Sequence, residues 1–431
     1  MSSQKFNLKK ISGVVKVPGD KSISHRAVML ASISKGVSRI YNLLESDDVL
    51  STVDMFRKLG VKIEKVNKTY YVYGAGLFGL KEPDDVLNVN NSGTTIRIGS
   101  GILAAQNFVS VLTGDSSILK RPMGRIVKPL RKMGAILYGK NNNTLPPLVI
   151  VGSSNIKGIK YKSSVASAQV KSAVLFAGLY SKSKVVYIEP SKSRDHTEMM
   201  FDYFNIPIKI CGNKIVLKNK QKEIHAKDIT VPGDISSAAY FIVAALLKPG
   251  NKVRIPGVGL NITRRAIIDV LRRMNANIEI KNVRIKNNEQ IGDVVVSYSP
   301  LKGTVVKAEE IPFIIDEIPV LSIAAMAADG ITVIRNAKEL RVKESDRINA
   351  IVVNLQKLGV PVKEFDDGFV ITGVKKIKSN KVINTFNDHR IAMSFIISSL
   401  LSDRGVVIDS LDSIKTSYPG FLTDIRRVSK V

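Results

Sequence analysis

The stretch Val17-Pro18-Gly19-Asp20 occurs a second time, as Val231-Pro232-Gly233-Asp234, about half of the 431-residue chain further on. Serines and then an apolar run follow each copy, so each predicts a strand, a tight turn and the start of a helix. Basic side chains follow at once only in the first copy, as Lys21, His25 and Arg26. A repeat of half the chain length predicts two similar halves, and chemistry in one copy suggests a site between them.

A shorter motif recurs in both halves: a basic helical turn, then Gly or Asn, then alternating apolar residues. Gly or Asn after the last turn ends a helix in the left-handed conformation, and the alternation begins a strand. The copies lie roughly 70–85 residues apart, which suits a βαβαββ unit better than a solenoid repeat. The expected helix stops are Gly60, Gly134, Asn275 and Gly359, with Asn205 in a degraded copy.

A last copy of this motif is expected as a helix near Phe421 to Val428, and its following strand has to come from the N-terminus. We therefore predict that residues 1–17 and 231–431 form one discontinuous domain and residues 18–230 form the other. Helix–Gly–strand junctions are common in any α/β protein, but the half-chain repeat favours the symmetric arrangement. The predicted fold class is α/β (α+β), with two pseudo-symmetric domains.

Composition narrows the class of protein. Two domains suit the chain length, and 44% hydrophobic residues supply sizeable cores. The single cysteine, Cys211, excludes an internal disulfide and a thiolate metal cluster, and the four histidines are scattered, so we expect no metal site. The first residues lack the apolar core of a signal peptide, and no apolar run is long enough to cross a bilayer. The sequence therefore predicts a cytoplasmic protein that does not contact membranes.

A net charge of +28 favours either a polyanionic partner or a heavily solvated lysine-rich surface. The lysines are spread through amphipathic helices and polar loops such as Lys375 to Lys381, without a basic tail or interleaved aromatic residues. Solvated surface is therefore the better explanation for most of the charge. Arginines and lysines beside glycine, serine or histidine are the better candidates for anion binding.

Eight polar segments lie where a loop is expected to meet a helix. Each has an ordinary alternative: a helix cap, a polar loop or, for Arg341 to Arg347, a solvated helix face. Pro122 fits the first position of a helix, and Asp316 is either a general base or an acid that favours the helix dipole. Together the segments predict a cleft between the domains that binds a small, multiply anionic ligand. The eight segments are Lys21–Arg26, Asn90–Arg97, Lys120–Met123, Ser163–Gln169, Pro190–Thr197, Ile315–Pro319, Arg341–Arg347 and Asn387–Met393.

These motifs resemble, in order and from end to end, those of the 5-enolpyruvylshikimate-3-phosphate synthase family. The specific matches include Pro-Gly-Asp-Lys-Ser-Ile-Ser-His-Arg at 18–26 and the motifs at 91–97, 120–123, 167–169, 193–198 and 316–319. The most diagnostic are Arg-Val-Lys-Glu-Ser-Asp-Arg at 341–347 and Asp-His-Arg-Ile-Ala-Met at 388–393. The resemblance implies two domains of three βαβαββ units each, with helices inside and sheets outside. It implies transfer of the enolpyruvyl group of phosphoenolpyruvate to the 5-hydroxyl of shikimate 3-phosphate, with release of phosphate, in aromatic amino acid biosynthesis.

The resemblance also implies residue roles. Asp316 would be the base for the attacking hydroxyl, while Glu344 and Lys21 would handle the proton that makes and unmakes the methyl group of the intermediate. Shikimate 3-phosphate would be held by Lys21, Ser22, Arg26, Ser167, Ala168, Gln169, Ser193, Asp316 and Lys343. Phosphoenolpyruvate would be held by Lys21, Gly93, Arg121, Gln169, Arg347, Arg390 and Lys415. The resemblance implies no cofactor and no metal.

Three positions depart from the family pattern. Ala168 stands where the family often has a serine, so its backbone N–H is expected to replace a hydroxyl. His196 stands where some members place a tyrosine against the shikimate ring. Lys415 precedes Tyr418-Pro419 with one residue more than the family's late lysine.

Two other classes of protein remain as alternatives. UDP-N-acetylglucosamine enolpyruvyl transferase shares the fold and chemistry, but it typically carries a cysteine near the position of Arg121, and this chain has none there. A basic nucleic-acid-binding protein would need aromatic platforms and gives no reason for acids such as Asp316 and Glu344 among the basic motifs. We expect a monomer that binds two small substrates and no nucleic acid.

Overall fold

The computed structural model describes residues 3–218 and 223–430, and the chain divides into two compact units. The central unit consists of Gly19–Val231 and Lys286–Asn288. The terminal unit consists of the chain up to Pro18, Pro232–Ile285 and the chain from Glu289 onward. The chain thus passes from one unit to the other inside each Val-Pro-Gly-Asp copy.

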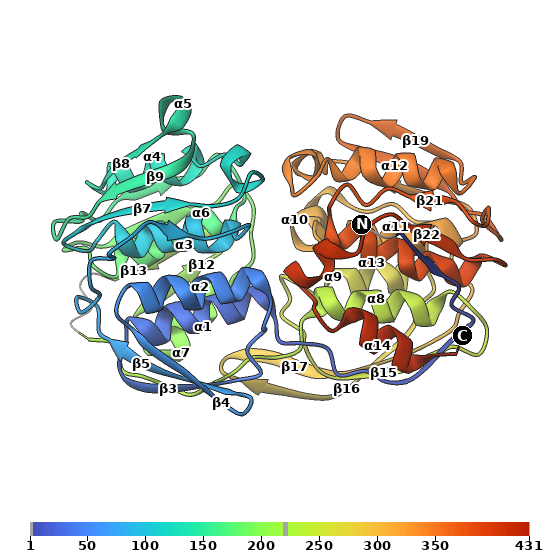
Figure 1. Cartoon of the computed structure of the whole chain (residues 1–431), viewed down its shortest axis with the longest axis horizontal. Coiled ribbons are helices and arrows are strands. Elements are labelled where there is room, and N and C mark those ends of the chain that lie inside the picture. The colour runs from blue at the N-terminus through green and yellow to red at the C-terminus, as the bar shows by residue number, and fades with distance from the viewer. Residues whose placement is uncertain (1–2, 219–222, 431) are drawn as a thin grey trace. The chain divides into compact units, whose positions relative to one another are not determined.

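Three four-stranded sheets with one common strand order form the outside of the central unit (Figure 1). In each, a parallel pair is followed by two antiparallel neighbours, as in the order β6-β7-β9-β8. The sheets are β14 (Ile229–Thr230), β3 (Lys35–Tyr41), β5 (Thr69–Ala75) and β4 (Lys62–Val66); β6 (Leu87–Asn88), β7 (Val109–Thr113), β9 (Leu145–Val151) and β8 (Ile136–Gly139); and β10 (Lys160–Lys162), β11 (Val185–Ile188), β13 (Lys214–Leu217) and β12 (Ile208–Cys211).

Helices alternate with these strands, so the central unit is built from three βαβαββ units. Helices α1, α2, α3 and α6 pack against one another on the inner side of the sheets, with β7 and β9 above them and β3, β4 and β5 below them in Figure 1. The helices are α1 (Lys21–Ser32), α2 (Asp47–Lys58), α3 (Gly93–Leu103), α4 (Gly124–Lys132), α5 (Lys140–Asn143), α6 (Ala168–Gly178) and α7 (His196–Tyr203), with the 3-10 helix η1 (Ile118–Lys120).

The expected helix stops are confirmed. Gly60, Gly134, Asn275 and Gly359 have φ angles of 84°, 92°, 70° and 80°, and Asn205 has 59°. Each follows a helix and precedes a strand, and the left-handed conformation turns the chain between them. Glycine and asparagine tolerate this conformation at the least steric cost.

The terminal unit repeats the plan around three further sheets. Strand β2 pairs with β15 in parallel and with β23 in antiparallel fashion. The strand after the last helix is therefore β23 of the C-terminal segment and does not come from the N-terminus as expected; the N-terminal segment supplies its neighbour β2. The sheets are β16 (Asn277–Lys286), β17 (Glu289–Ser297), β15 (Lys252–Gly259), β2 (Lys10–Val14) and β23 (Ser429–Lys430); β18 (Ile331–Ile334), β20 (Gly368–Thr372) and β19 (Val362–Phe365); and β1 (Gln4–Phe6), β22 (Val406–Ile408) and β21 (Val382–Ile383).

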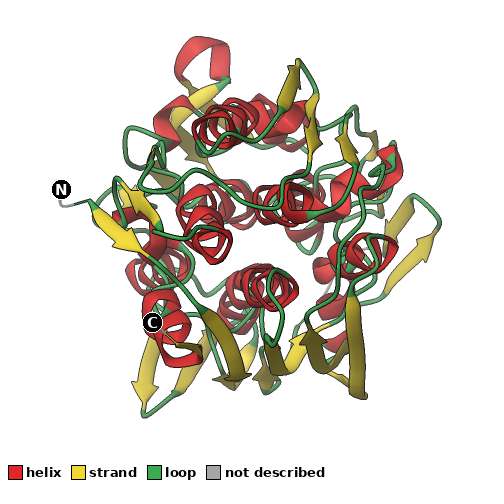
Figure 2. Cartoon of the chain, turned by 90° about the vertical axis from the view of Figure 1, so that its right-hand side faces the viewer, coloured by secondary structure: helices red, strands yellow, loops and turns green. Residues whose placement is uncertain are grey.

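Helices fill the interior of the terminal unit. Helices α8 and α11 are almost entirely apolar and buried on all sides, as expected of helices enclosed by other elements. In Figure 2, where this unit faces the viewer, helices are seen end-on with strands at the periphery. The helices are α8 (Ile235–Leu246), α9 (Ala266–Arg273), α10 (Ile311–Ile314), α11 (Ile318–Ala327), α12 (Arg347–Lys357), α13 (His389–Ser398) and α14 (Phe421–Val428), with the 3-10 helices η2 (Ala308–Glu310), η3 (Lys338–Val342), η4 (Ser399–Leu401) and η5 (Asp412–Thr416).

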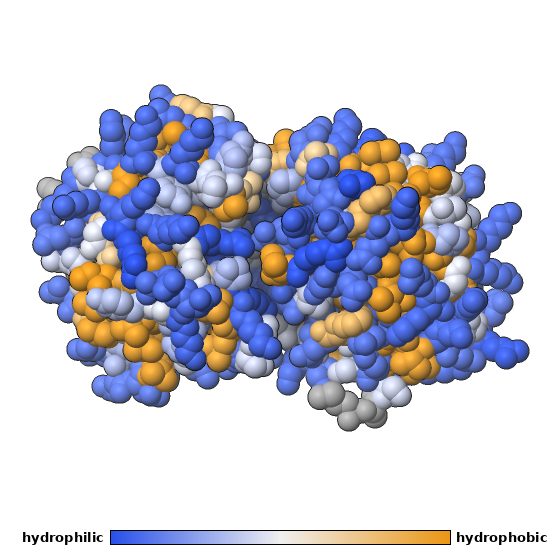
Figure 3. Space-filling model, turned by 90° about the horizontal axis from the view of Figure 1, so that it is seen from above, coloured by the Kyte–Doolittle hydropathy of each residue, from blue (hydrophilic) through white to orange (hydrophobic). Residues whose placement is uncertain are grey.

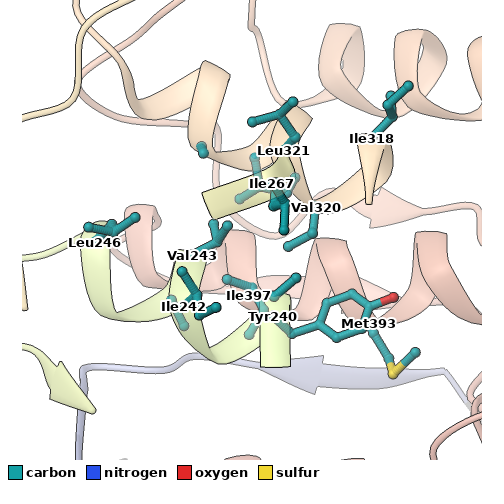
Figure 4. Close-up of a cluster of buried hydrophobic side chains, with 14 of the residues drawn as sticks. Tyr240, Ile242, Val243, Leu246, Ile267, Ile318, Val320, Leu321, Met393 and Ile397 are labelled. Atoms are coloured by element: carbon teal, nitrogen blue, oxygen red, sulfur yellow. The ribbon is translucent and has the colours of Figure 1, made fainter. Parts of the chain in front are cut away.

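Four of these helices form one apolar cluster. Tyr240 and Val243 of α8, Leu321 of α11 and Met393 of α13 are buried together, and Ile267 of α9 joins them (Figure 4). This cluster holds the N-terminal ends of α11 and α13 in a fixed relation, and both ends carry residues of the polar segments.

The structure corrects two expectations. Pro122 does not occupy the first position of a helix, because α4 begins at Gly124 after Met123. The segment Arg341 to Arg347 is not a solvated helix face: it runs from η3 through a loop to the start of α12, and Arg347 is buried. The lysines of Lys375 to Lys381 are exposed, as expected, and Figure 3 shows hydrophilic side chains over much of the face viewed from above.

Candidate active site

Three helix N-termini in the central unit carry residues of the polar segments. Asp20 accepts a hydrogen bond from the N–H of Ile23 at the start of α1 (2.9 Å). The Ser92 hydroxyl accepts from Thr95 at the start of α3 (3.3 Å), and that of Ser167 accepts from Val170 at the start of α6 (3.4 Å). Helix N-termini favour anions through their N–H groups and dipole. The N-terminus of α6 presents Ala168 and Gln169 at its first two positions.

Two arginines meet at the first residue of α3. A Cβ atom at Gly93 would lie 3.1 Å from Nη1 of Arg121 and 3.1 Å from Nη1 of Arg97, so glycine leaves the space in front of both guanidinium groups open. Nη1 of Arg97 donates to Oε1 of Gln169 (2.7 Å), and Nη2 of Arg121 donates to Oδ1 of Asn91 (2.6 Å). Gly93, Arg121 and Gln169, predicted from separate segments, therefore lie in one group.

Arg26 is buried against hydroxyl groups. Its Nε donates to Oγ1 of Thr197 (2.7 Å), its Nη2 to Oγ of Ser172 (2.8 Å), and its Nη1 to the carbonyl oxygen of Ser22 (2.8 Å). Lys21, at the start of the same helix, forms an ion pair with Asp48 of α2 (2.9 Å). These contacts fix the cationic groups of α1 in place.

The loop before α7 contributes Ser193, which is buried. Its N–H donates to Oε2 of Glu189 (3.2 Å), and its hydroxyl donates to the same carboxylate. His196, at the first position of α7, is also buried.

A second charged group lies in the terminal unit around Asp316, directly before α11. Its carboxylate is 3.5 Å from Nη1 of Arg347, 4.0 Å from Nη2 of Arg390 and 4.0 Å from Nη1 of Arg264. A carboxylate in this position can act as a general base toward a bound hydroxyl group.

Arg347 is anchored by two further acids. Its Nε donates to Asp388 at 2.8 Å and its Nη2 to Glu344 at 2.6 Å. Burial opposes the positive charge, but Asp388 and Glu344 outweigh it and raise the pKa of Arg347. Asp388 also caps α13 by accepting the N–H of Arg390 (2.8 Å). The buried carboxylate of Asp388 therefore positions both Arg347 and Arg390.

Lys343 and Lys415 differ in their surroundings. Burial lowers the pKa of the Lys343 ammonium, and the nearby Asp316 opposes the shift, so Lys343 belongs to the Asp316 group. Lys415 is exposed in η5. Over residues 3–218 and 223–430, the structure gives it no hydrogen bond or ion pair with that group.

Arg264 was not predicted, and Glu317 was given no role of its own within the predicted segment Ile315–Pro319. Arg264 is buried and donates from Nη2 to the hydroxyl of Ser236 (2.6 Å), which in turn donates to Glu317. Nη2 of Arg264 also lies 3.6 Å from Asp234. The second Val-Pro-Gly-Asp copy thus receives its positive charge from another segment. The signal available in the sequence was the pair Arg264-Arg265 just before a short amphipathic helix.

The arrangement suits chemistry on small anions. Each unit presents cations held by neighbouring acids or amides, and the terminal unit adds two carboxylates, Asp316 and Glu344, that can accept or donate a proton. Within the described residues, His, Cys, Asp and Glu side chains form no group of three or more that could hold a metal ion. None of the described helices has the length and apolar character needed to cross a membrane.

Comparison with known sequences identifies one family. The family model described as EPSP synthase (3-phosphoshikimate 1-carboxyvinyltransferase) matches residues 7–425. A 3-phosphoshikimate 1-carboxyvinyltransferase of Alkaliphilus metalliredigens is 48% identical over 421 residues, which cover 98% of each chain. That of Petrotoga mobilis is 45% identical over 422 residues, again 98% of each.

Two solved structures have a fold similar to that of this chain. The EPSP synthase from Acinetobacter baumannii is 40% identical and superposes with a TM-score of 0.90, covering 99% of this chain and 98% of that one. The enolpyruvyl transferase NikO from Streptomyces tendae is 16% identical with a TM-score of 0.77, covering 99% and 97% of the two chains, and this likeness shows the fold.

Proposed function

Because the chain belongs to the EPSP synthase family and transfers the enolpyruvyl group of phosphoenolpyruvate to shikimate 3-phosphate, we propose that the charged groups of its two units act together on this pair of substrates. Each substrate carries one phosphate and one carboxylate, so bringing them together requires several fixed cations. The two units would close around the substrates to complete the site.

Shikimate 3-phosphate is held mainly by the central unit in this proposal. Its ligands there are Lys21, Ser22, Arg26, Ser167, Gln169 and Ser193, together with the backbone N–H of Ala168. The capped N-termini of α1 and α6 support this assignment, because phosphate oxygens bind well at such ends. Lys343 and Asp316 of the terminal unit complete the set.

Phosphoenolpyruvate is held by arginines of both units. Arg121 beside Gly93 supplies a planar fork for a carboxylate or phosphate, and Arg347 and Arg390 supply two further forks. Lys21 and Gln169 take part in both substrate sites. Lys415 remains a proposed ligand that would have to be brought to the substrate, because its side chain is exposed.

The reaction is addition followed by elimination. Asp316 accepts the proton of the 5-hydroxyl as its oxygen attacks C2 of phosphoenolpyruvate, and Lys21 or Glu344 delivers a proton to C3, which becomes a methyl group. Loss of phosphate from C2 and removal of one methyl proton by the same groups restore the double bond. General acid–base groups contribute roughly 10²–10⁴-fold to such steps.

The observation that carries these roles is the position of Asp316, whose carboxylate lies between Arg347 and Arg390. The direct test measures phosphate release with both substrates and with each omitted, for the wild type and for Asp316→Asn. Release only with both substrates, and its loss in the variant, supports the proposal. Unchanged turnover by the variant would show that Asp316 only favours the dipole of α11.

We further propose that the enzyme acts as a monomer in the cytoplasm. Both statements come from the sequence. Light scattering on the eluting protein during gel filtration tests the first, and fractionation of the source cells tests the second.

A further inference from the structure

Three ionisable side chains are buried together in the central unit. Nζ of Lys171 on α6 lies 3.0 Å from Oε1 of Glu189 and 2.7 Å from Oε1 of Glu198, and all three side chains are at most 2% exposed. Glu189 follows β11, and Glu198 lies in the first turn of α7. We refer to these three residues as the Lys171 triad. A buried ion cluster is usually no more stable than an apolar one of the same volume, so stability alone does not explain it.

Glu189 connects the Lys171 triad to Ser193. Glu189 uses Oε1 for Lys171 and Oε2 for Ser193, whose N–H (3.2 Å) and hydroxyl both donate to it. The conformation of the loop that presents Ser193 therefore depends on a carboxylate that Lys171 holds in place.

Lys171 and Glu198 connect the triad to the surroundings of Arg26. Ser172 and Thr197 are the chain neighbours of Lys171 and Glu198, and their hydroxyl oxygens are 2.6 Å apart. Both accept hydrogen bonds from Arg26, at 2.8 and 2.7 Å. The ion pair between Lys171 and Glu198 thus joins α6 to α7 at the level where Arg26 binds both helices.

Lys171 is the common partner of two buried acids. Burial raises the pKa of the Glu198 carboxyl, and the neighbouring Lys171 opposes this shift. The lysine therefore offsets part of the cost of burying the carboxylate that joins α7 to α6.

We propose that the Lys171 triad positions Ser193 and Arg26 for shikimate 3-phosphate, an inference that rests on the binding roles proposed above for these two residues. Lys171, Glu189 and Glu198 are positioning residues, because they act through Ser193 and through the α6–α7 contact. Their loss impairs binding of shikimate 3-phosphate and leaves binding of phosphoenolpyruvate near normal.

The test uses an apolar replacement of the whole triad, Lys171→Met with Glu189→Leu and Glu198→Leu, in the full chain. This variant keeps the volume and leaves no buried charge unpaired, but Ser193 loses the acceptor for its N–H and hydroxyl. We therefore expect it to fold with a melting temperature moderately below that of the wild type. The KM for shikimate 3-phosphate is expected to rise about 10–100-fold, as for loss of hydrogen bonds to a charged group. The KM for phosphoenolpyruvate is expected to stay within about twofold.

Glu189→Gln is the second variant, because an amide keeps the size and can still accept from Ser193. It is expected to bind shikimate 3-phosphate more weakly than wild type and more tightly than the apolar triple variant. Arg39→Met is the matched control: it breaks the Arg39–Asp228 pair of the same unit (2.5 Å), which lies on exposed surface, and should change neither KM.

The outcomes separate this inference from the proposed function. Failure of the wild type to release phosphate with both substrates would overturn the proposed function itself. A working wild type together with a folded triple variant whose KM for shikimate 3-phosphate is unchanged, or whose two KM values rise equally, would overturn the positioning role. If the triple variant does not fold, a normal KM for shikimate 3-phosphate in Glu189→Gln overturns it, and a selective rise supports it.

Discussion

Arg390 contacts both the backbone and the side chain of Asp316. Its Nη1 donates to the carbonyl oxygen of Asp316 at 2.8 Å, and its Nη2 lies 4.0 Å from the Asp316 carboxylate. The start of α13 and the start of α11 are therefore linked by one side chain. A shift of Arg390 would move the backbone that presents Asp316.

The first prediction concerns Asp316→Asn. The amide keeps the size of the side chain but cannot accept the hydroxyl proton as a base, so kcat should fall by about 10²–10⁴-fold. Turnover is measured at saturating concentrations of both substrates. The matched control is Asp367→Asn, since Asp367 also pairs with an arginine, Arg335 at 2.6 Å, but away from the proposed site. Equal losses in both variants would contradict a role for Asp316 as base.

The second prediction separates Arg121 from the general positive charge. In Arg121→Lys the planar fork held by Asn91 is lost, and an ammonium cannot bind a carboxylate at two points. The KM for phosphoenolpyruvate should rise well beyond that for shikimate 3-phosphate. Replacing the exposed Lys375, Lys376 and Lys378 by glutamine should alter neither KM. Comparable changes in both sets of variants would mean that long-range attraction explains the basic residues.

The third prediction is an alkaline limit set by Lys343. Burial lowers the pKa of this lysine, so its positive charge is lost at a pH below that of an ordinary lysine as the pH rises. The value of kcat/KM for shikimate 3-phosphate, which reports groups of the free enzyme, should therefore decline at alkaline pH. Lys343→Arg should move this decline to higher pH, because arginine stays protonated. The same alkaline limb in both proteins would assign it to another group.

The fourth prediction is closure on binding shikimate 3-phosphate. The proposed ligands are divided between the two units, so binding should pull the units together and reduce the radius of gyration in small-angle scattering. Arg26→Met, which should bind this substrate poorly, is the control and should not become more compact at the same concentration. An unchanged radius for wild type, with binding shown by calorimetry, would count against closure.

Local rules predicted most of the fold. The helix stops at Gly60, Gly134, Asn205, Asn275 and Gly359 were predictable because the left-handed conformation restricts the choice of residue at a single position. Each stop depends on its own few neighbours, so one sequence is enough to find it.

The wrong or missing predictions concern residues whose structure depends on contacts with distant parts of the chain. Pro122 satisfies the local rule for a helix start, but the helix begins at Gly124, and proline fits an extended loop equally well. Arg347 belongs to a run that locally resembles a solvated surface, yet Asp388, far along the chain, makes its burial possible. Arg264 was missed for the same reason, because Ser236 and Asp316 come from other segments.

Part of the candidate site was predictable only through the family resemblance. The segments around Gly93, Arg121 and Gln169 were each ambiguous when taken alone, and the structure groups their side chains within one unit. The Lys171 triad had no sequence signal, since a lysine inside an apolar helix gives no hint of its two distant acids.

The pairing of β1 with β22 bears on how the terminal unit is made. About 400 residues separate β1 from its partner Val406–Ile408, so β1 waits roughly 20–80 s at a synthesis rate of 5–20 residues per second. Strand β2 can pair sooner, because its parallel partner β15 lies at Lys252–Gly259. The central unit lies almost wholly within Gly19–Val231 and can assemble while β1 is still without its neighbour. The sheet that contains β1 would therefore be completed after the fold of the central unit.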